Sequence, residues 1–86
     1  MQDHDNESRT LDVVLSILRP FAKGGAVIDA DTPLLEMEII DSAAMVTILL
    51  ELVLRLGIRI SASDLTFDHF QSARILAQRF SDRRDN

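Results

Sequence analysis

The pair Asp41-Ser42 is the part of the chain whose residue types and position best suit chemistry. It stands where an acidic stretch meets an apolar run, Ala43 to Leu56, that contains neither Gly nor Pro. A side-chain oxygen of Ser or Asp can accept a hydrogen bond from the free N–H groups in the first turn of a helix. The same position offers unpaired amides and the positive end of the helix dipole, which both favour a phosphate. Ser42 can therefore either cap a helix or carry a phosphodiester.

Other groups of polar residues offer less. His4 and His69 have no second ligand at a useful spacing, and the chain has no Cys, so a metal site is not expected. Glu36 and Glu38 lie two residues apart in a loop and need not converge as a catalytic pair. Gly24-Gly25 lacks the spacing of a phosphate-binding loop. No catalytic residue is predicted.

Composition indicates one small domain. The chain has 86 residues and 47% hydrophobic content, and its core must be mainly aliphatic because it has four Phe and no Trp or Tyr. The first nine residues are polar and lack the apolar core of a signal peptide. The longest apolar stretch is interrupted by Thr47 and Glu51 and is too short to span a membrane. A cytoplasmic protein without membrane insertion is expected.

Acidic residues are concentrated just before Ser42. The net charge is −5, and the acidic side chains of this stretch are Asp29, Asp31, Glu36, Glu38 and Asp41. Such a surface repels nucleic-acid phosphates, so DNA or RNA binding is not expected. It either favours encounters with basic partners or simply solvates a loop.

Helical spacing and stop signals divide the chain into four helices and one long loop. Ser8 or Thr10 is the expected cap of the first helix, Pro20 its end or a kink, and Gly57 the end of the second. The long loop holds too many apolar residues for disorder, so we expect it to pack across the helices. Ile58 to Ile60 is predicted to be a linker, since a single strand would have no partner. The predicted helices cover residues 10–19, 42–56, 63–67 and 69–80.

The predicted fold is all-α, a small bundle of three longer helices and one short one. The domain is expected over residues 9–81, with a disordered N-terminus over 1–8 and a frayed, solvated C-terminus over 82–86. The predicted core contains Leu15, Leu18, Ile48, Leu52, Leu56, Ile60, Ile75 and Leu76.

The helix predicted over residues 42–56 is apolar on two adjacent stripes. The first contains Met45, Ile48, Leu49, Leu52 and Leu56, and the second contains Val46, Leu50, Val53 and Leu54. Packing against one layer requires a single stripe of about 100°. The second stripe must then be covered by the loop, by the short helix or by another molecule.

Taken together, these features resemble the acyl carrier protein family. The resemblance covers residues 9–81 and rests on the order of helices and loop and on three stretches: Thr32-Pro-Leu-Leu35, Ile39-Ile-Asp-Ser42, and residues 58–72 with Asp64-Leu-Thr-Phe67. It implies an acyl-carrier-protein-like bundle. Ser42 would be the attachment site for 4′-phosphopantetheine, transferred from coenzyme A by a phosphopantetheinyl transferase, and Asp41 the acidic residue of the motif. The cofactor would supply the thiol that the chain lacks.

The resemblance also implies a role without catalysis. The protein would be a monomeric, stand-alone carrier whose thiol is loaded by an adenylating ligase and which presents the thioester-bound acyl or aminoacyl group to a downstream acceptor or modifying enzyme. The implied partner surface contains Ala43, Val46, Thr47, Leu50, Val53 and Leu54. Three departures stand out: Ala43 replaces the usual large apolar residue, Glu38 the usual glycine, and the acidic positions of fatty-acid carriers are Thr47, Val53 and Leu54. The downstream stretch resembles that of D-alanyl and specialised-pathway carriers. The alternative is an unmodified helical module that binds a partner helix through the second stripe, with Ser42 as a plain cap.

Overall fold

The first helix of the computed structural model is α1, Gln2–Leu18, within a stretch that contains no Gly or Pro. The structure describes residues 2–22, 27–81 and 83, and only the backbone of residues 2–5. Val14, Ile17 and Leu18 are buried. Pro20 ends the α-helix as predicted, and the chain continues as the 3₁₀ turn η1, Arg19–Phe21.

The start of α1 differs from the prediction. Residues 2–8 are helical, so the disorder expected over residues 1–8 is corrected for residues 2–8, and the helix starts earlier than the predicted residue 10. Neither Ser8 nor Thr10 caps the helix, since both lie inside it. The Asn6 side chain donates a hydrogen bond to the Ser81 carbonyl at 3.4 Å, which ties the early turns of α1 to the other end of the chain.

The second helix, α2, spans Ser42–Leu56, the predicted bounds. Gly57 closes it with a left-handed φ of 66°, and its N–H donates to the Val53 carbonyl at 2.9 Å. Glycine suits this position because it has no Cβ to oppose a positive φ. The buried face of α2 contains Ala44, Met45, Ile48, Leu49 and Leu52.

The loop between α1 and α2 packs across the helices, as predicted, through Ile28, Leu34, Ile39 and Ile40. Val27 and Met37 are exposed and do not take part. Two backbone bonds join the loop to the C-terminal region: Arg74 N–H to Ala30 O at 2.8 Å, and Leu34 N–H to Gln71 O at 3.0 Å. Gly24 and Gly25 lie outside the described residues.

Beyond α2 the chain forms two 3₁₀ turns, η2 (Ala62–Asp64) and η3 (Phe67–Phe70), and the helix α3, Ala73–Phe80. They replace the predicted helices over 63–67 and 69–80. Each element has its own N-terminal cap, from Ser61, Thr66 and Ser72, so the chain restarts three times and cannot run as one helix.

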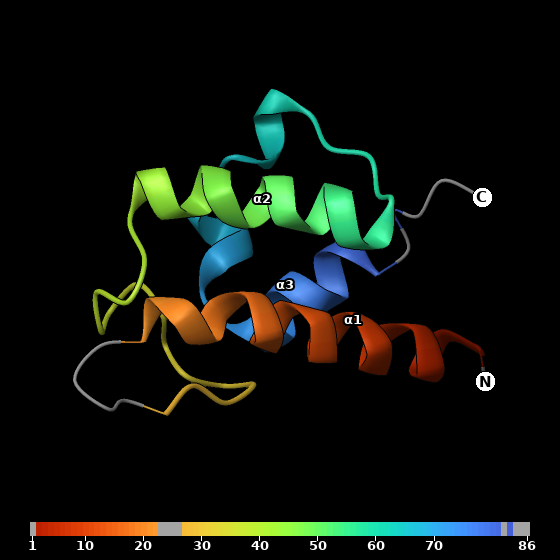
Figure 1. The fold of residues 1–86 in the computed structure, drawn as a ribbon, viewed down its shortest axis with the longest axis horizontal. Helices are drawn as coiled ribbons and strands as arrows, with labels where there is room; N and C mark the ends of the chain where they lie inside the picture. The colour runs from red at the N-terminus through yellow and green to blue at the C-terminus, as the bar shows by residue number, and fades with distance from the viewer. Residues whose placement is uncertain (1, 23–26, 82, 84–86) are drawn as a thin grey trace.

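The three α-helices enclose one core, with α1 packed against both α2 and α3 (Figure 1). The described residues contain no β-sheet, and the all-α bundle is confirmed. Of the predicted core residues, Leu18, Ile48, Leu52 and Leu76 are buried; Leu15, Leu56 and Ile60 pack against the core partly exposed; and Ile75 is half-buried. Phe70 and Phe80 are fully buried aromatic members of the core.

The segment after Gly57 has a backbone partner, contrary to the prediction of an unpaired linker. Arg59 N–H donates to the carbonyl of Arg83 at 3.2 Å. Arg83 is half-buried and its guanidinium lies 5.0 Å from the centre of the Phe80 ring. The frayed end predicted over residues 82–86 is therefore wrong for Arg83, and residues 82 and 84–86 lie outside the described part of the chain.

Candidate functional site

The start of α2 is built by Asp41. Its backbone is extended (φ −131°), and its Oδ1 accepts a hydrogen bond from Ala44 N–H at 2.8 Å. Its carbonyl accepts from Met45 N–H at 2.9 Å and begins the helical pattern. The buried pair Ile39 and Ile40 anchors the chain immediately before it. Asp41 therefore performs the capping role that the sequence also allowed for Ser42.

Ser42 is the first residue of the helix and is exposed. Among the residues that the structure describes, its hydroxyl has no hydrogen-bond partner. The neighbouring side chain, Ala43, is also exposed and too small to cover the hydroxyl. Because Asp41 satisfies only the third amide of the turn, the amides of Ser42 and Ala43 remain available to an anion, at the positive end of the helix dipole.

A Schellman-type turn brings the loop to this point. Ile39 N–H donates to Leu34 O at 2.9 Å and Glu38 N–H to Leu35 O at 3.1 Å, with φ of Glu38 at +55°. Glu38 thus occupies the left-handed position that favours glycine, the residue that the resembled family usually has here. In this chain a glutamate adopts that conformation.

Two grooves border the start of α2. One, of about 440 Å³, is lined by Ser42, Met45, Val46, Leu65, Thr66 and Phe67. The other, of about 300 Å³, is lined by residues of η1, of the loop before α2 and of α2 itself: Phe21, Glu38, Ile39, Ile40, Asp41, Ala43, Ala44 and Thr47. Four of the six residues that line the first groove are apolar, so a group attached to Ser42 has apolar surface within reach.

The second stripe of α2 is exposed along most of its length. Val46, Leu50 and Leu54 are 43%, 55% and 79% exposed, as expected for a surface not covered by the chain itself. Val53 differs: it is partly buried and packs against the core. Thr47 is exposed, and its hydroxyl donates back to Ala43 O at 3.3 Å. The first stripe is buried except for Leu56, so the two stripes were assigned to the correct sides.

The exposed apolar surface extends beyond α2. Leu65 and Phe67, on either side of Thr66, are 46% and 56% exposed. Leu65 also lines a third groove, of about 280 Å³, together with Val46, Leu49, Leu50, Ile60, Ser61 and Ala62. These two residues were not predicted to lie at the surface. The alternation of polar and apolar residues from Asp64 to Phe67 would favour the opposite arrangement, with the apolar side chains inward, so no local pattern indicates their exposure.

Acidic side chains are spread along the loop before α2, and of these Glu38 and Asp41 line a groove at the start of that helix. Asp29, Asp31, Glu36, Glu38 and Asp41 are all exposed. Asp31 is paired with Arg74, at 2.7 Å and 3.1 Å, and hydrogen bonding to this guanidinium lowers the pKa of the Asp31 carboxyl. The pair joins the loop to α3.

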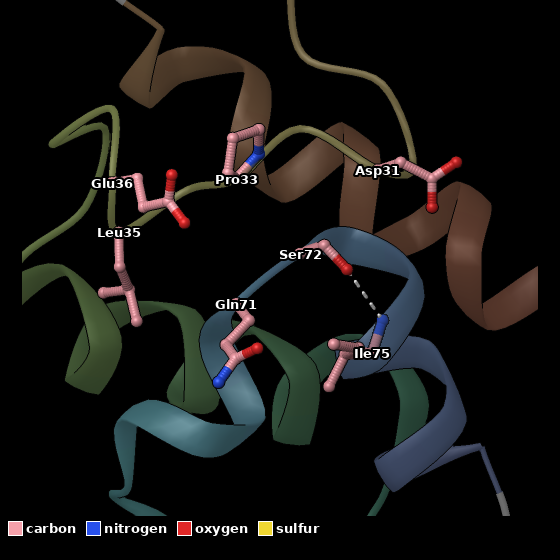
Figure 2. Close-up of a pocket in the computed structure, with 7 residues that line it drawn as sticks. All are labelled: Asp31, Pro33, Leu35, Glu36, Gln71, Ser72 and Ile75. Carbon is pink, nitrogen blue, oxygen red and sulfur yellow. Dashed lines mark hydrogen bonds between the residues drawn. The ribbon is translucent and has the colours of Figure 1, made fainter.

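A further pocket, of about 420 Å³, lies between the loop and the start of α3 (Figure 2). Its lining residues are Asp31, Pro33, Leu35, Glu36, Gln71, Ser72 and Ile75, and none of them belongs to α2. The one serine in it, Ser72, is occupied as the cap of α3, since its Oγ accepts from Ile75 N–H at 3.2 Å. The pocket therefore lacks a free nucleophile comparable to Ser42.

Neither a metal cluster nor a membrane-spanning helix is found in the described part of the chain. His69 lies beside Asp64, with Nε2 3.5 Å from Oδ1, and the side chain of His4 lies outside the described residues. Glu36 and Glu38 are both exposed loop residues.

Comparison with known proteins leaves the site to be interpreted from its own geometry. No protein-family model matches this chain, and searches of curated proteins and of solved structures likewise found no match.

Proposed function

We propose that this protein is a stand-alone acyl or aminoacyl carrier with 4′-phosphopantetheine on Ser42. The observation that supports the proposal most directly is that Asp41 and Ser42 have separate roles at the start of α2. Asp41 caps the helix, so the Ser42 hydroxyl is exposed and free of hydrogen bonds to described residues. A residue that served only as a cap would have its oxygen engaged with the helix amides.

The surroundings of Ser42 suit a phosphodiester. In the proposed modification the Ser42 oxygen attacks the β-phosphorus of coenzyme A, the pyrophosphate P–O bond breaks, and 3′,5′-ADP leaves while a base of the transferase takes the serine proton. The amides of Ser42 and Ala43 and the positive end of α2 would stabilise the negative charge of the product phosphodiester. The thiol at the end of the arm then carries cargo as a thioester, in a chain without Cys.

The protein itself catalyses nothing in this proposal. Its partners are the transferase, an adenylating ligase that loads the thiol, and a downstream acceptor or modifying enzyme. The exposed residues Val46, Leu50 and Leu54 give a largely apolar docking surface whose affinity comes from desolvation. The acidic loop steers basic partners and disfavours nucleic acid.

Incubation with coenzyme A and a broad-specificity phosphopantetheinyl transferase tests the proposal. We expect intact-mass spectrometry to show a gain of one phosphopantetheine, absent in Ser42→Ala. Ser63→Ala is the matched control, because Ser63 is also exposed but its Oγ pairs with Ser61 Oγ at 2.8 Å. Retained modification in Ser42→Ala, or no modification of the wild type by several transferases, would refute the carrier function.

The second candidate is an unmodified helical interaction module, favoured by the exposure of Leu54 and Leu50. For either candidate, Leu54→Glu should leave the thermal melt unchanged, because the side chain is 79% exposed. Val53→Glu should lower the melting temperature, because Val53 packs against the core and an unpaired charge would be partly buried. Leu54 is therefore the position at which a substitution can test partner binding without disturbing the fold. The transferase experiment above separates the two candidates.

A further inference from the structure

Asp64 is a buried carboxylate in a segment that otherwise has no buried residue. From residue 59 to residue 69 every side chain is exposed or half-buried except that of Asp64, which is 3% exposed. The next buried residues on either side are Ile58 and Phe70. The inner anchor of this stretch is therefore an ionisable group in place of the usual apolar side chain.

The Asp64 carboxylate has three polar partners: Arg83, Ser61 and His69. Arg83 Nη1 lies 3.0 Å from Oδ1 and 2.9 Å from Oδ2, and Ser61 N–H donates to Oδ2 at 2.9 Å. His69 Nε2 is 3.5 Å from Oδ1. The guanidinium also lowers the pKa of the Asp64 carboxyl, chiefly through its hydrogen bond. A buried carboxylate is tolerated because these donors replace water.

Arg83 and His69 connect this carboxylate to the rest of the fold. Arg83 lies over the Phe80 ring at the end of α3, and its carbonyl accepts from Arg59 N–H at 3.2 Å. The His69 ring meets the Phe80 ring edge to face, with centres 5.4 Å apart. The buried Nδ1 of this ring has no hydrogen-bond partner among the described residues, so the contact of Nε2 with Asp64 is the one polar contact of the ring there.

The anchored stretch forms one wall of the groove at Ser42. Leu65 and Phe67 lie in it, and they face Val46 and Met45 across that groove. Both apolar side chains are about half exposed, so their own burial contributes only part of what is needed to hold them in place. Within this stretch the inward contacts are the buried carboxylate of Asp64 and the partly exposed side chain of Ile60, which packs against the core.

We propose that the contact of Asp64 with Arg83 and His69 is an electrostatic clasp that sets the position of residues 59–69, and with it the shape of the groove beside Ser42. The clasp holds this wall without being needed for the packing of α1, α2 and α3 against one another. It acts whether or not Ser42 carries a cofactor.

Hydrogen exchange of the full chain, followed by NMR, tests the clasp in Asp64→Asn, Arg83→Gln and the double variant. We expect amides of residues 59–69 to exchange at least tenfold faster in each, with less than a twofold change in the core of α2. Methyl shifts of Val46 and Leu65 should move, whereas those of Val14 should not. The double variant should equal the more affected single variant, because either single substitution already removes the pairing of opposite charges.

The matched control is Asp31→Asn, which removes the charge from an Asp–Arg contact of similar length whose side chains are 71% and 47% exposed. It should leave exchange in residues 59–69 unchanged. Unchanged exchange in the Asp64 and Arg83 variants would overturn the proposal. So would a uniform acceleration across all helices, or loss of folding, because the contact would then be a general contribution to stability.

Discussion

Because Asp41 caps α2 and the Ser42 hydroxyl is free, we expect alanine substitutions at these two residues to change the free energy of unfolding differently. In Asp41→Ala the Ala44 amide loses its 2.8 Å acceptor, and the loss of such a cap costs about 0.5–2 kcal/mol. Asp41 is exposed, so we expect a cost of about 1 kcal/mol, since water can partly replace the carboxylate. In Ser42→Ala no side-chain bond to a described residue is lost, and the higher helix propensity of Ala gives a change between zero and a gain of about 0.5 kcal/mol.

Urea unfolding followed by circular dichroism at 222 nm measures both changes. For a small domain the slope is about 1 kcal/mol per molar urea, so Asp41→Ala should lower the midpoint by about 1 M. Ser42→Ala should leave it unchanged or slightly higher. Asp41→Asn is the control for charge: it keeps the acceptor and loses only the interaction with the helix dipole, about 0.3–1 kcal/mol. Its midpoint should fall between those of Asp41→Ala and the wild type.

The opposite order of stability losses in these two variants would contradict the assignment of the cap to Asp41. If Ser42→Ala lost about 1 kcal/mol and Asp41→Ala were neutral, Ser42 would be the cap and its hydroxyl would be engaged with the helix. The central support for the proposed attachment site would then be gone.

Three further predictions concern the fold. Glu38→Gly should raise the free energy of unfolding by about 0.5–1 kcal/mol in urea titrations, because relief of a left-handed backbone, about 1–2 kcal/mol, exceeds the entropy that Gly adds to the unfolded chain; a loss of stability would show that Glu38 is not strained. Leu52→Ala should cost about 2–5 kcal/mol, since this side chain is fully buried, and an unchanged melting temperature would contradict its place in the core. The pKa of Asp64 is lowered from 3.8, so its contribution to stability is present above pH 3.8 and is lost as the pH falls through the lower folded value. The stability difference between wild type and Asp64→Asn should therefore shrink in acid, and a difference that stays constant between pH 6 and pH 2 would contradict the lowered pKa.

The bounds of α2 could be predicted because both ends carry local signals. Asp41 supplies an acceptor for the first turn, and Gly57 supplies a positive φ after the last. The start of α1 could not be predicted, because no residue between Gln2 and Thr10 stops or starts a helix unambiguously. The Asn6 contact with Ser81 joins residues 75 positions apart, so its contribution is invisible in the local sequence.

The candidate site was predictable to a similar extent. The spacing of α2 separated its buried and exposed stripes, yet Val53 lies at the border between them, and only the packing of the neighbouring elements decides which side it joins. The burial of Asp64 could not be predicted, because a charged residue is buried only when its partners are present, and Arg83 is 19 residues away. The exposure of Leu65 and Phe67 accompanies the burial of Asp64, so it could not be predicted either.

The bonds between the central loop and the C-terminal region have a consequence for the order of folding. The backbone acceptor for Leu34 is Gln71, and the acceptor for Arg74 is Ala30, so the loop completes its structure only when α3 is in place. The partners of α1 also include α3, at the far end of the chain (Figure 1). During synthesis these contacts cannot form until the last helix has left the ribosome, because the chain emerges from its N-terminus. Folding of this domain should therefore be a cooperative event that waits for the synthesis of α3, and a nascent chain stopped before residue 71 should remain sensitive to protease even though α1 and α2 are complete.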